Sequence, residues 1–289
     1  MKTISKSTAW TVVKGLRFLP FHAVTFLLLL PAALHAQTDS LQLLQLLPRN
    51  TTTYQVGLGS SHVLDTYLSQ EKFSGTGLTL LATTEREKPG KRWTTFMEHQ
   101  VNLASTHDRS DTQSQLQGDY TLLVGRLYQW QLPHRWTVQA GGALCGNIGF
   151  IYNTSNSNNP AQARLSASVM PTVTVSKRMQ LFHRHLQVRY ELNVPLVGIM
   201  FSPNYGQSYY EIFSRGNYDH NIVPTTFVSA PTFRQQLTVR YSISNHTAIS
   251  LGYLGDYQQT DVNQLKTHIY SHRLMLGIVR QFSIINHRL

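Results

Sequence analysis

The fold is decided by three consecutive stretches, WTVQAGGALCGNIGFIY (136–152), ARLSASVMPTVTVS (163–176) and LQVRYELNV (186–194). In each of them apolar and polar residues alternate, so that Leu144 and Ile148, for example, fall on the opposite side from Asn147. Strands of soluble proteins usually have about five or six residues, whereas strands that cross an outer membrane at a tilt need about ten. Alternation sustained over this length is typical of a strand with one face toward lipid and the other toward a polar lumen. We therefore predict an all-β fold, a transmembrane antiparallel up-and-down β-barrel.

The N-terminal region predicts export across the inner membrane. Four lysine and arginine residues within the first 17 precede an apolar run over residues 24–30, and small residues follow up to Ala36. This order is that of a secretory signal peptide, and the run is too short for a transmembrane anchor. We expect residues 1–36 to be the signal peptide, residues 37–50 a short periplasmic lead-in, and residues 51–289 the barrel.

Charge and cysteine content narrow the partners. The net charge of +11 includes the four positive charges of the signal, and the remaining bases are scattered without a run. A nucleic-acid-binding protein would show a clustered basic face, so we expect no nucleic-acid partner. Phosphate-bearing outer-membrane lipid is the partner that scattered bases fit. The single cysteine, Cys145, excludes an internal disulfide, and its place on the small, polar side of its strand predicts a luminal thiol shielded from lipid.

Strand counting gives seven strands before residue 200 and three after residue 231, a barrel of ten. Residues 200–231 alternate poorly and form either one long external loop or a hidden hairpin, which would make twelve strands. Short turns are expected at 85–91, 131–135, 177–184 and 244–247, and longer loops at 62–72, 105–115, 151–161 and 258–267. Because barrels of this class have short periplasmic turns and long external loops, both ends of the barrel chain are expected on the periplasmic side.

Two segments carry residues that no strand pattern demands: GLGSSHVLDTYLSQEKFSG (57–75) and PNYGQSYYEIFSRGNYDHN (203–221). Through them the chain resembles a family of uncharacterised Bacteroidales-type outer-membrane barrels, known as a domain of unknown function. The likeness extends over nearly all of the mature chain. It implies a signal-bearing barrel in the outer membrane, which is that of a Gram-negative bacterium. Barrel-insertion machinery is an expected partner, because the last strand carries an aromatic residue, Phe282, of the kind that such machinery reads. The resemblance implies no activity, because no catalytic or binding residues are established for the family.

The second of these segments is the candidate ligand site. Tyrosine offers apolar area together with a hydroxyl, and long loops of a rigid scaffold often carry function. The candidate ligand-binding residues are Tyr209, Tyr210, Glu211, Arg215, Tyr218 and Asp219. The alternative is a loop that packs on itself and closes the lumen.

Hydrolysis of lipid or peptide is the alternative function. Ser208 with Asp219 and His220 has the residue types of a nucleophile, an orienting acid and a base, and so does Ser60 with His62 and Asp65. Such triads are recognised by geometry, which sequence does not supply. No catalytic residue, cofactor or metal is therefore assigned.

The alternation also predicts the contents of the lumen. Four charged residues, Arg189, Glu191, Arg234 and Arg240, point inward, and buried charges must be paired. The favoured interpretation is a polar network that fills the lumen; a selectivity lining is the alternative. An open aqueous channel needs about sixteen strands, more than this chain supplies. We thus expect a non-enzymatic barrel that binds or passes a small ligand, or that serves the envelope structurally.

Overall fold

A computed structural model describes residues 49–156 and 159–283 of the chain. Its strands are β1 (Arg49–Asp65), β2 (Ser69–Glu87), β3 (Trp93–His107), β4 (Ser114–Leu132), β5 (Trp136–Asn153), β6 (Ala161–Leu181), β7 (Arg184–Asn193), β8 (Val197–Phe201), β9 (Ile222–Thr226), β10 (Phe233–Ser242), β11 (Thr247–Val262) and β12 (Leu265–Ser283). Two short helical elements, η1 (Pro133–Arg135) and α2 (Tyr209–Phe213), lie between them. The predicted signal peptide and nearly all of the lead-in fall outside the described residues and stay predictions. Among the described residues, no helix has the length and hydropathy needed to cross a membrane.

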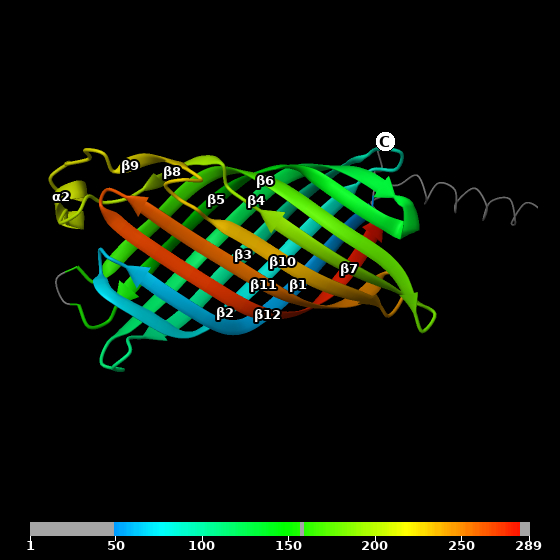
Figure 1. Cartoon of the computed structure of the whole chain (residues 1–289), viewed down its shortest axis with the longest axis horizontal. Helices are drawn as coiled ribbons and strands as arrows, with labels where there is room; N and C mark the ends of the chain where they lie inside the picture. The colour runs from blue at the N-terminus through cyan, green and yellow to red at the C-terminus, as the bar shows by residue number, and fades with distance from the viewer. Residues whose placement is uncertain (1–48, 157–158, 284–289) are drawn as a thin grey trace, which may run out of the picture. The chain divides into compact units, whose positions relative to one another are not determined.

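Ten tilted antiparallel strands close into a barrel, and β8 and β9 are two extra strands attached to it (Figure 1). The ring runs from β1 to β7, continues with β10, β11 and β12, and closes where β12 pairs with β1. The predicted ten-stranded barrel is confirmed. The hairpin considered for residues 200–231 also exists, but it does not widen the ring, because β9 pairs only with β8 among the described strands.

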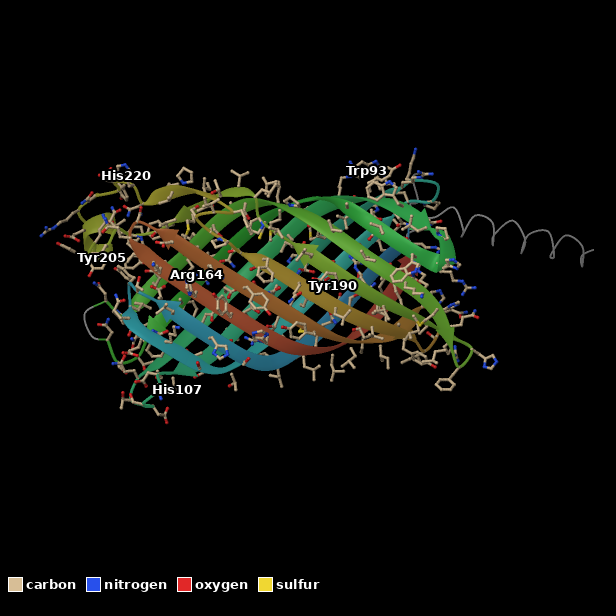
Figure 2. All side chains as sticks on the ribbon, viewed as in Figure 1. Trp93, His107, Arg164, Tyr190, Tyr205 and His220 are labelled. Carbon is tan, nitrogen blue, oxygen red and sulfur yellow. The ribbon has the colours of Figure 1, made fainter. Side chains whose placement is uncertain are left out.

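The two ends of the barrel differ in their connections. At one end the turns 88–92, 133–135, 182–183 and 243–246 lie with the first residue of β1 and the last residue of β12. Figure 2 shows Trp93 at this end and His107, Tyr205 and His220 at the other. The other end carries the segment 194–232 with α2.

The prediction of long loops is wrong for two segments, 62–72 and 258–267. The segment 62–72 is mostly strand, with a turn over 66–68, and the segment 258–267 is strand apart from Asn263 and Gln264. Both of these residues have positive φ, 51° and 60°, which is the conformation of a two-residue hairpin turn. The strands therefore extend beyond the apolar outer band, to a region where polar residues such as His62 and Ser74 lie on the outer face and apolar residues such as Val63 lie inside.

The wall is apolar outside and polar inside. Leu144 and Leu274 are 67% and 64% exposed on the outer face, whereas Thr172 and Asn193 are fully buried in the lumen. This distribution is the reverse of that in a soluble barrel, and it is the one expected for a barrel surrounded by lipid hydrocarbon. Tryptophans Trp93, Trp130 and Trp136 mark the short-turn edge of the apolar band, as expected where a barrel meets a membrane interface.

Apolar clusters interrupt the polar lumen: a small one joins Leu81, Leu254 and Met275, and two others are larger. One, near the end that carries α2, joins the inward side chains Val63, Leu68, Phe73, Ile151 and Ile269. The other lies against β3 to β6 and joins Phe96, Leu123, Leu127, Ala143 and Met170. Between these clusters the fully buried Arg273 donates to Thr79 Oγ1 (3.2 Å) and Ser61 Oγ (2.7 Å). Gly77 makes room for it, since a Cβ there would lie 2.2 Å from the guanidinium.

Candidate functional site

The barrel wall is interrupted between β9 and β11. Strand β7 pairs with β10 only as far as Asn193 opposite Arg234, and beyond that point β8 takes its place beside β6. Strand β9 extends β8 on the outer side, but no described strand pairs with its free edge. Figure 1 shows β8 and β9 along one side of the barrel, separate from β11. The wall there is thus held by side chains and loop contacts rather than by a ladder.

Two prolines explain why the ladder stops. Pro195 follows the end of β7 after one residue, Val194, and proline has no N–H to donate to a continuing strand. Pro224 lies inside β9, and within sheets proline is confined to edge strands and bulges. The remaining bonds across the gap come from the loop before β10: Asp261 N donates to Ser229 O (2.9 Å), and Thr232 Oγ1 donates to Gln259 O (3.4 Å).

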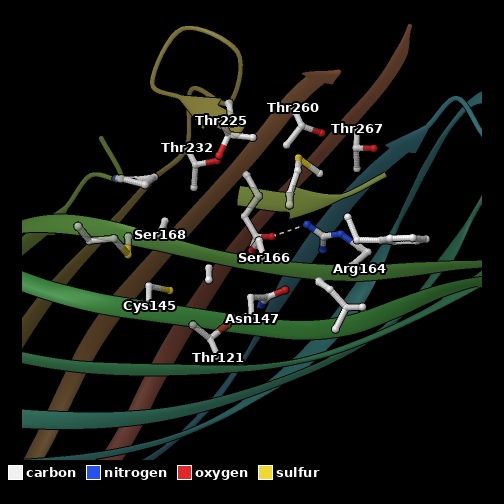
Figure 3. Close-up of a pocket in the computed structure, with 18 of the residues that line it drawn as sticks. Thr121, Cys145, Asn147, Arg164, Ser166, Ser168, Thr225, Thr232, Thr260 and Thr267 are labelled. Atoms are coloured by element: carbon white, nitrogen blue, oxygen red, sulfur yellow. Dashed lines mark hydrogen bonds between the residues drawn. The ribbon is translucent and has the colours of Figure 1, made fainter. Parts of the chain in front are cut away.

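A cavity of about 120 Å³ lies behind this gap (Figure 3). It reaches from the lumen, where Thr121, Cys145 and Asn147 line it, to the gap, where Thr225 and Thr232 do. Its apolar lining comes from Leu123, Leu165, Met170, Leu196, Val197, Met200 and Phe201. At about 10–15 Å³ of such space per water molecule, it has room for roughly ten. The cavity therefore fits a small ligand or one end of a longer one.

Arg164 is the charged group of the cavity with spare hydrogen-bonding capacity. Its Nη2 donates to Gln258 Oε1 at 2.7 Å, the bond drawn in Figure 3. Its Nη1 is buried and has no hydrogen-bond partner. Within the described residues, no carboxylate lies close enough to form a salt bridge with it. An unsatisfied buried donor is unusual in a folded protein, and a water molecule or a ligand acceptor would satisfy it.

The other charged residues of the cavity are already paired. Arg234 Nη2 lies 2.6 Å from Glu98 Oε1, an ion contact that lacks hydrogen-bond alignment, and Arg234 Nε donates to Gln100. Asp256 Oδ2 accepts from Gln100 (3.1 Å) and Gln258 (3.2 Å). These contacts hold the walls of the cavity in place. Arg234 Nη1 also lacks a hydrogen bond, but it lies 3.6 Å from Glu191 Oε1, so within the described residues Arg164 is the cavity arginine without a carboxylate in salt-bridge range.

The four charged residues expected in the lumen lie there and share one network. Arg189 contacts Glu85 and donates to Glu191 (2.8 Å), and Arg234 lies 3.6 Å from Glu191. Arg240 lies 3.4 Å from Glu85. The network contains three arginines and three glutamates, and it fills the lumen on the short-turn side of the cavity.

Sequence reasoning did not find two members of the network or the open arginine of the cavity. Glu85 was placed in a turn, although β2 runs on to Glu87. Glu98 was lost because β3 has apolar Phe96 inside and polar His99 outside, where it pairs with Tyr120 Oη at 2.8 Å. Arg164 lay on the predicted inner face of its strand, but its free Nη1 depends on which neighbours reach it.

The candidate loop residues lie on the segment 203–221, and none of the six lines the cavity. Tyr209 Oη accepts from the N–H of Ala163 (2.7 Å) and so fastens α2 to β6. Glu211 completes a capping box with Ser208, whose backbone N–H lowers the pKa of the Glu211 carboxyl. Tyr210, Arg215, Tyr218 and Asp219 are exposed, with Arg215 stacked over Tyr210 at 5.4 Å.

The two segments that resemble a known family meet in space. Tyr67 Oη donates to the carbonyl of Gln207 (3.1 Å), and the rings of Tyr67 and Tyr209 pack edge to face at 5.7 Å. Gln207 Oε1 in turn accepts from Asn204 N–H (3.0 Å) and Asn221 Nδ2 (2.7 Å). These contacts fold the segment 203–221 onto the β1–β2 turn.

Neither serine–histidine–aspartate trio assembles. Ser208 Oγ is engaged with Glu211, while His220 and Asp219 form an exposed pair 2.6 Å apart. His62 bonds Ser74 on the outer face of β1, whereas Asp65 is buried in the lumen. Among the described residues, no three histidine, cysteine, aspartate or glutamate side chains are grouped as metal ligands.

Several solved structures are similar to this chain. Neisserial surface protein A shares 10% identity over 81% of this chain and 97% of its own, with a TM-score of 0.37. The translocator domain of the autotransporter NalP from Neisseria meningitidis shares 10% over 87% and 98%, also at 0.37. The outer membrane protease OmpT from Escherichia coli shares 5% over 81% and 97%, again at 0.37. These scores are too low to transfer a role, and the barrel assignment stands on strand pairing and on the apolar outer face.

No curated protein matches the chain. The sequence profile of a family described as a protein of unknown function, DUF3316, matches residues 22–289. This match extends over almost the whole sequence and includes both segments, 57–75 and 203–221, that meet at the end that carries α2. The chain belongs to the DUF3316 family.

Proposed function

We propose that the protein is a non-enzymatic barrel of the Gram-negative outer membrane that binds a small ligand in the cavity beside Arg164. Its apolar outer face and tryptophan edge support the membrane location. A ring of paired strands satisfies the backbone N–H and C=O groups of its members in a bilayer. The short turns and the ends of the barrel chain then face the periplasm, and the segment 194–232 faces outward. Barrel-insertion machinery and outer-membrane lipid are the partners that this location entails.

The observation that carries the proposal is the cavity with its unpartnered guanidinium nitrogen. Binding is favoured over conduction because the ion-pair network and two apolar clusters occupy the lumen along its length. It is favoured over hydrolysis because neither trio is brought together. The six candidate loop residues remain predicted contacts for a ligand that extends beyond the cavity.

Cys145 provides the test, because the only cysteine of the chain lines the cavity. The protein is refolded into phosphatidylcholine vesicles and treated with methyl methanethiosulfonate, a reagent small enough for the cavity. We expect complete modification of folded protein, which is recognised by its shifted migration without boiling, and no modification by a 5-kDa polyethylene glycol maleimide. The same vesicles should show no conductance steps and no release of fatty acid or peptide products. An unreactive Cys145 would refute the binding cavity, and hydrolysis would establish the enzymatic alternative.

A further inference from the structure

We propose that the ligand is an amphipathic carboxylic acid with a single acyl chain, and that it enters the cavity sideways from the outer leaflet, between β9 and β11. This inference rests on the proposed function, and it adds a ligand class and a route. Four features support it: the depth of the gap, the edge of β9, the lining of the cavity, and the Arg164 Nη1 atom that has no hydrogen-bond partner.

The gap lies at the depth of the apolar band. Val197 in β8 is in the hydrogen-bonded row of Val169 and Leu144, and Leu144 is midway between the aromatic ends of β5. Because the strands are tilted, this row moves toward the end that carries α2 as it passes from β5 to β8. Phe201, at the far end of β8, is in the row of Leu165 and Ile148. The hairpin of β8 and β9 thus covers the outer half of the band, and the gap beside it faces the outer leaflet.

The free edge of β9 supports an opening at this depth. Unpaired backbone groups are not tolerated against hydrocarbon, and irregular backbone occurs there only where it is buried in protein or lines a cavity. Thr225 and Thr226 of β9 both line the cavity, as do Ala230 and Thr232 after it. Part of the edge is satisfied by the chain itself: Thr226 N–H donates to Ser229 Oγ (3.0 Å), Thr226 O accepts from Ala230 N–H (2.8 Å), and Pro224 has no N–H. The rest of the edge lies beside the cavity.

The lining shows that the cavity reaches the outer surface. Leu196 and Val197 line it, and they are also 55% and 54% exposed. Side chains that face both a cavity and the lipid side form the rim of an opening. A molecule dissolved in the outer leaflet meets this apolar rim first, and only an apolar chain passes it without a desolvation cost.

The chemistry beyond the rim selects the headgroup. Arg164 Nη1 is buried and free, and Nη2 is fixed by Gln258, so the guanidinium is held in one orientation. A carboxylate accepts a charge-assisted hydrogen bond from it, and an alcohol accepts only a weaker one. The small volume fits a carboxylate with part of its chain, and it excludes a two-chain lipid headgroup.

The route is tested by labelling Cys145 from two directions. In phosphatidylcholine vesicles, a maleimide carried on a dodecyl chain reaches the protein from the bilayer, and a sulfonated maleimide reaches it from water. We expect the dodecyl reagent to label Cys145 faster, in contrast to the sequence-based expectation that this thiol is shielded from lipid. Ala230→Trp should slow the labelling at least about tenfold by filling the gap. Leu251→Trp, on the lipid-facing side of β11, is the matched control and should leave the rate unchanged.

The ligand class is tested by protection of Cys145. Dodecanoic acid should slow labelling by methyl methanethiosulfonate, and dodecanol should do so at least about tenfold less well. Arg164→Gln should remove the difference between acid and alcohol, whereas Arg126→Gln, at the opposite end of the barrel, should keep it. Migration without boiling confirms that each variant is folded.

The outcomes separate this inference from the proposed function. If methyl methanethiosulfonate and the sulfonated maleimide label Cys145 but the dodecyl reagent does not, the cavity stands and lateral entry is wrong. Equal protection by acid and alcohol would overturn the headgroup assignment. If no reagent labels folded protein, both proposals fail together.

Discussion

Glu191 is a shared carboxylate of the luminal network, in contact with two arginines and one asparagine. It accepts from Arg189 (2.8 Å) and from Asn193 (3.0 Å), and Arg234 lies 3.6 Å away. With Glu85 and Glu98 it balances three arginines in a region without exposed surface. Removing one carboxylate leaves a net buried charge, and breaking a buried pair by removing one partner costs about 3–5 kcal/mol.

Glu191→Gln should therefore destabilise the folded barrel by about 3 kcal/mol, because the amide keeps the shape but not the charge. Glu191→Leu should cost at least as much. Equilibrium unfolding in urea from lipid vesicles measures both, with Glu71→Gln as an exposed control on β2 that should change nothing. A leucine variant more stable than the wild type would place Glu191 against lipid and reverse the assignment of inside and outside.

At this scale, period-two alternation was enough to place the side chains of β5, β6 and β7. It worked because both faces of these strands are uniform: lipid contacts one face, and polar neighbours contact the other. It failed at β3, where Phe96 fills an apolar cluster inside the lumen and His99 bonds Tyr120 outside. Both exceptions depend on neighbouring strands, which the sequence of β3 does not contain.

Among the elements, the segment 203–221 is organised by one side chain. Gln207 bonds Asn204, Asn217 and Asn221 and receives Tyr67 on its carbonyl. Gln207→Ala should loosen this segment without unfolding the barrel, because it removes the side-chain bonds to Asn204, Asn217 and Asn221 within the segment and none of the ring ladders involves it. Limited proteolysis of folded protein should then cut within 203–221 at least about tenfold faster. Tyr205→Ala, at an exposed position in the same segment, should leave the cutting rate unchanged.

The β3–β4 loop should be sensitive to acid. Hydrogen bonds from the Ser110 hydroxyl and the Gln113 N–H lower the pKa of Asp108 to about 2. Because this is below the ordinary value of about 3.9, the carboxylate stabilises the folded loop above about pH 4, and this is lost as the pH falls through 2. Hydrogen exchange at the Thr112 and Gln113 amides should show protection at pH 4 that disappears near pH 2. In Asp108→Asn, which keeps the neighbouring His107–Asp111 pair, protection should not vary over this range.

The limits of sequence reasoning at the scale of elements lie outside the membrane. The sequence predicts loops at the ends of β1, β2, β11 and β12, because polar residues replace the apolar ones on the outer face there, while the inner face is apolar. The β11–β12 turn also lacks the glycine that usually marks such a hairpin, since Asn263 and Gln264 supply its two positive φ angles. From the sequence, residues 200–231 are compatible with either a loop or a hairpin. Strands β8 and β9 have only five residues each, and β9 contains Pro224, so their alternation is too short to distinguish the two.

For the molecule as a whole, the orientation in the membrane is the first property to check. An epitope tag inserted in the β5–β6 loop should be accessible to antibody on intact cells, because this loop is at the end that carries α2. A tag in the β6–β7 turn, at residues 182–183, should be accessible only after the outer membrane is permeabilised. The reverse pattern would show that the barrel is inserted the other way round.

Closure of the ring by β1 and β12 has a consequence for the order of events in biosynthesis. The partner of the first strand is the last one to leave the ribosome, with Arg49 opposite Ser283. Until then β1 has an open edge, which binds other chains readily if it is not guarded. A chain that stops before Leu265 presents two open edges that lipid does not tolerate. The ring can therefore close only after β12 has been synthesised, and a chain that lacks β12 has no partner for the outer edge of β1.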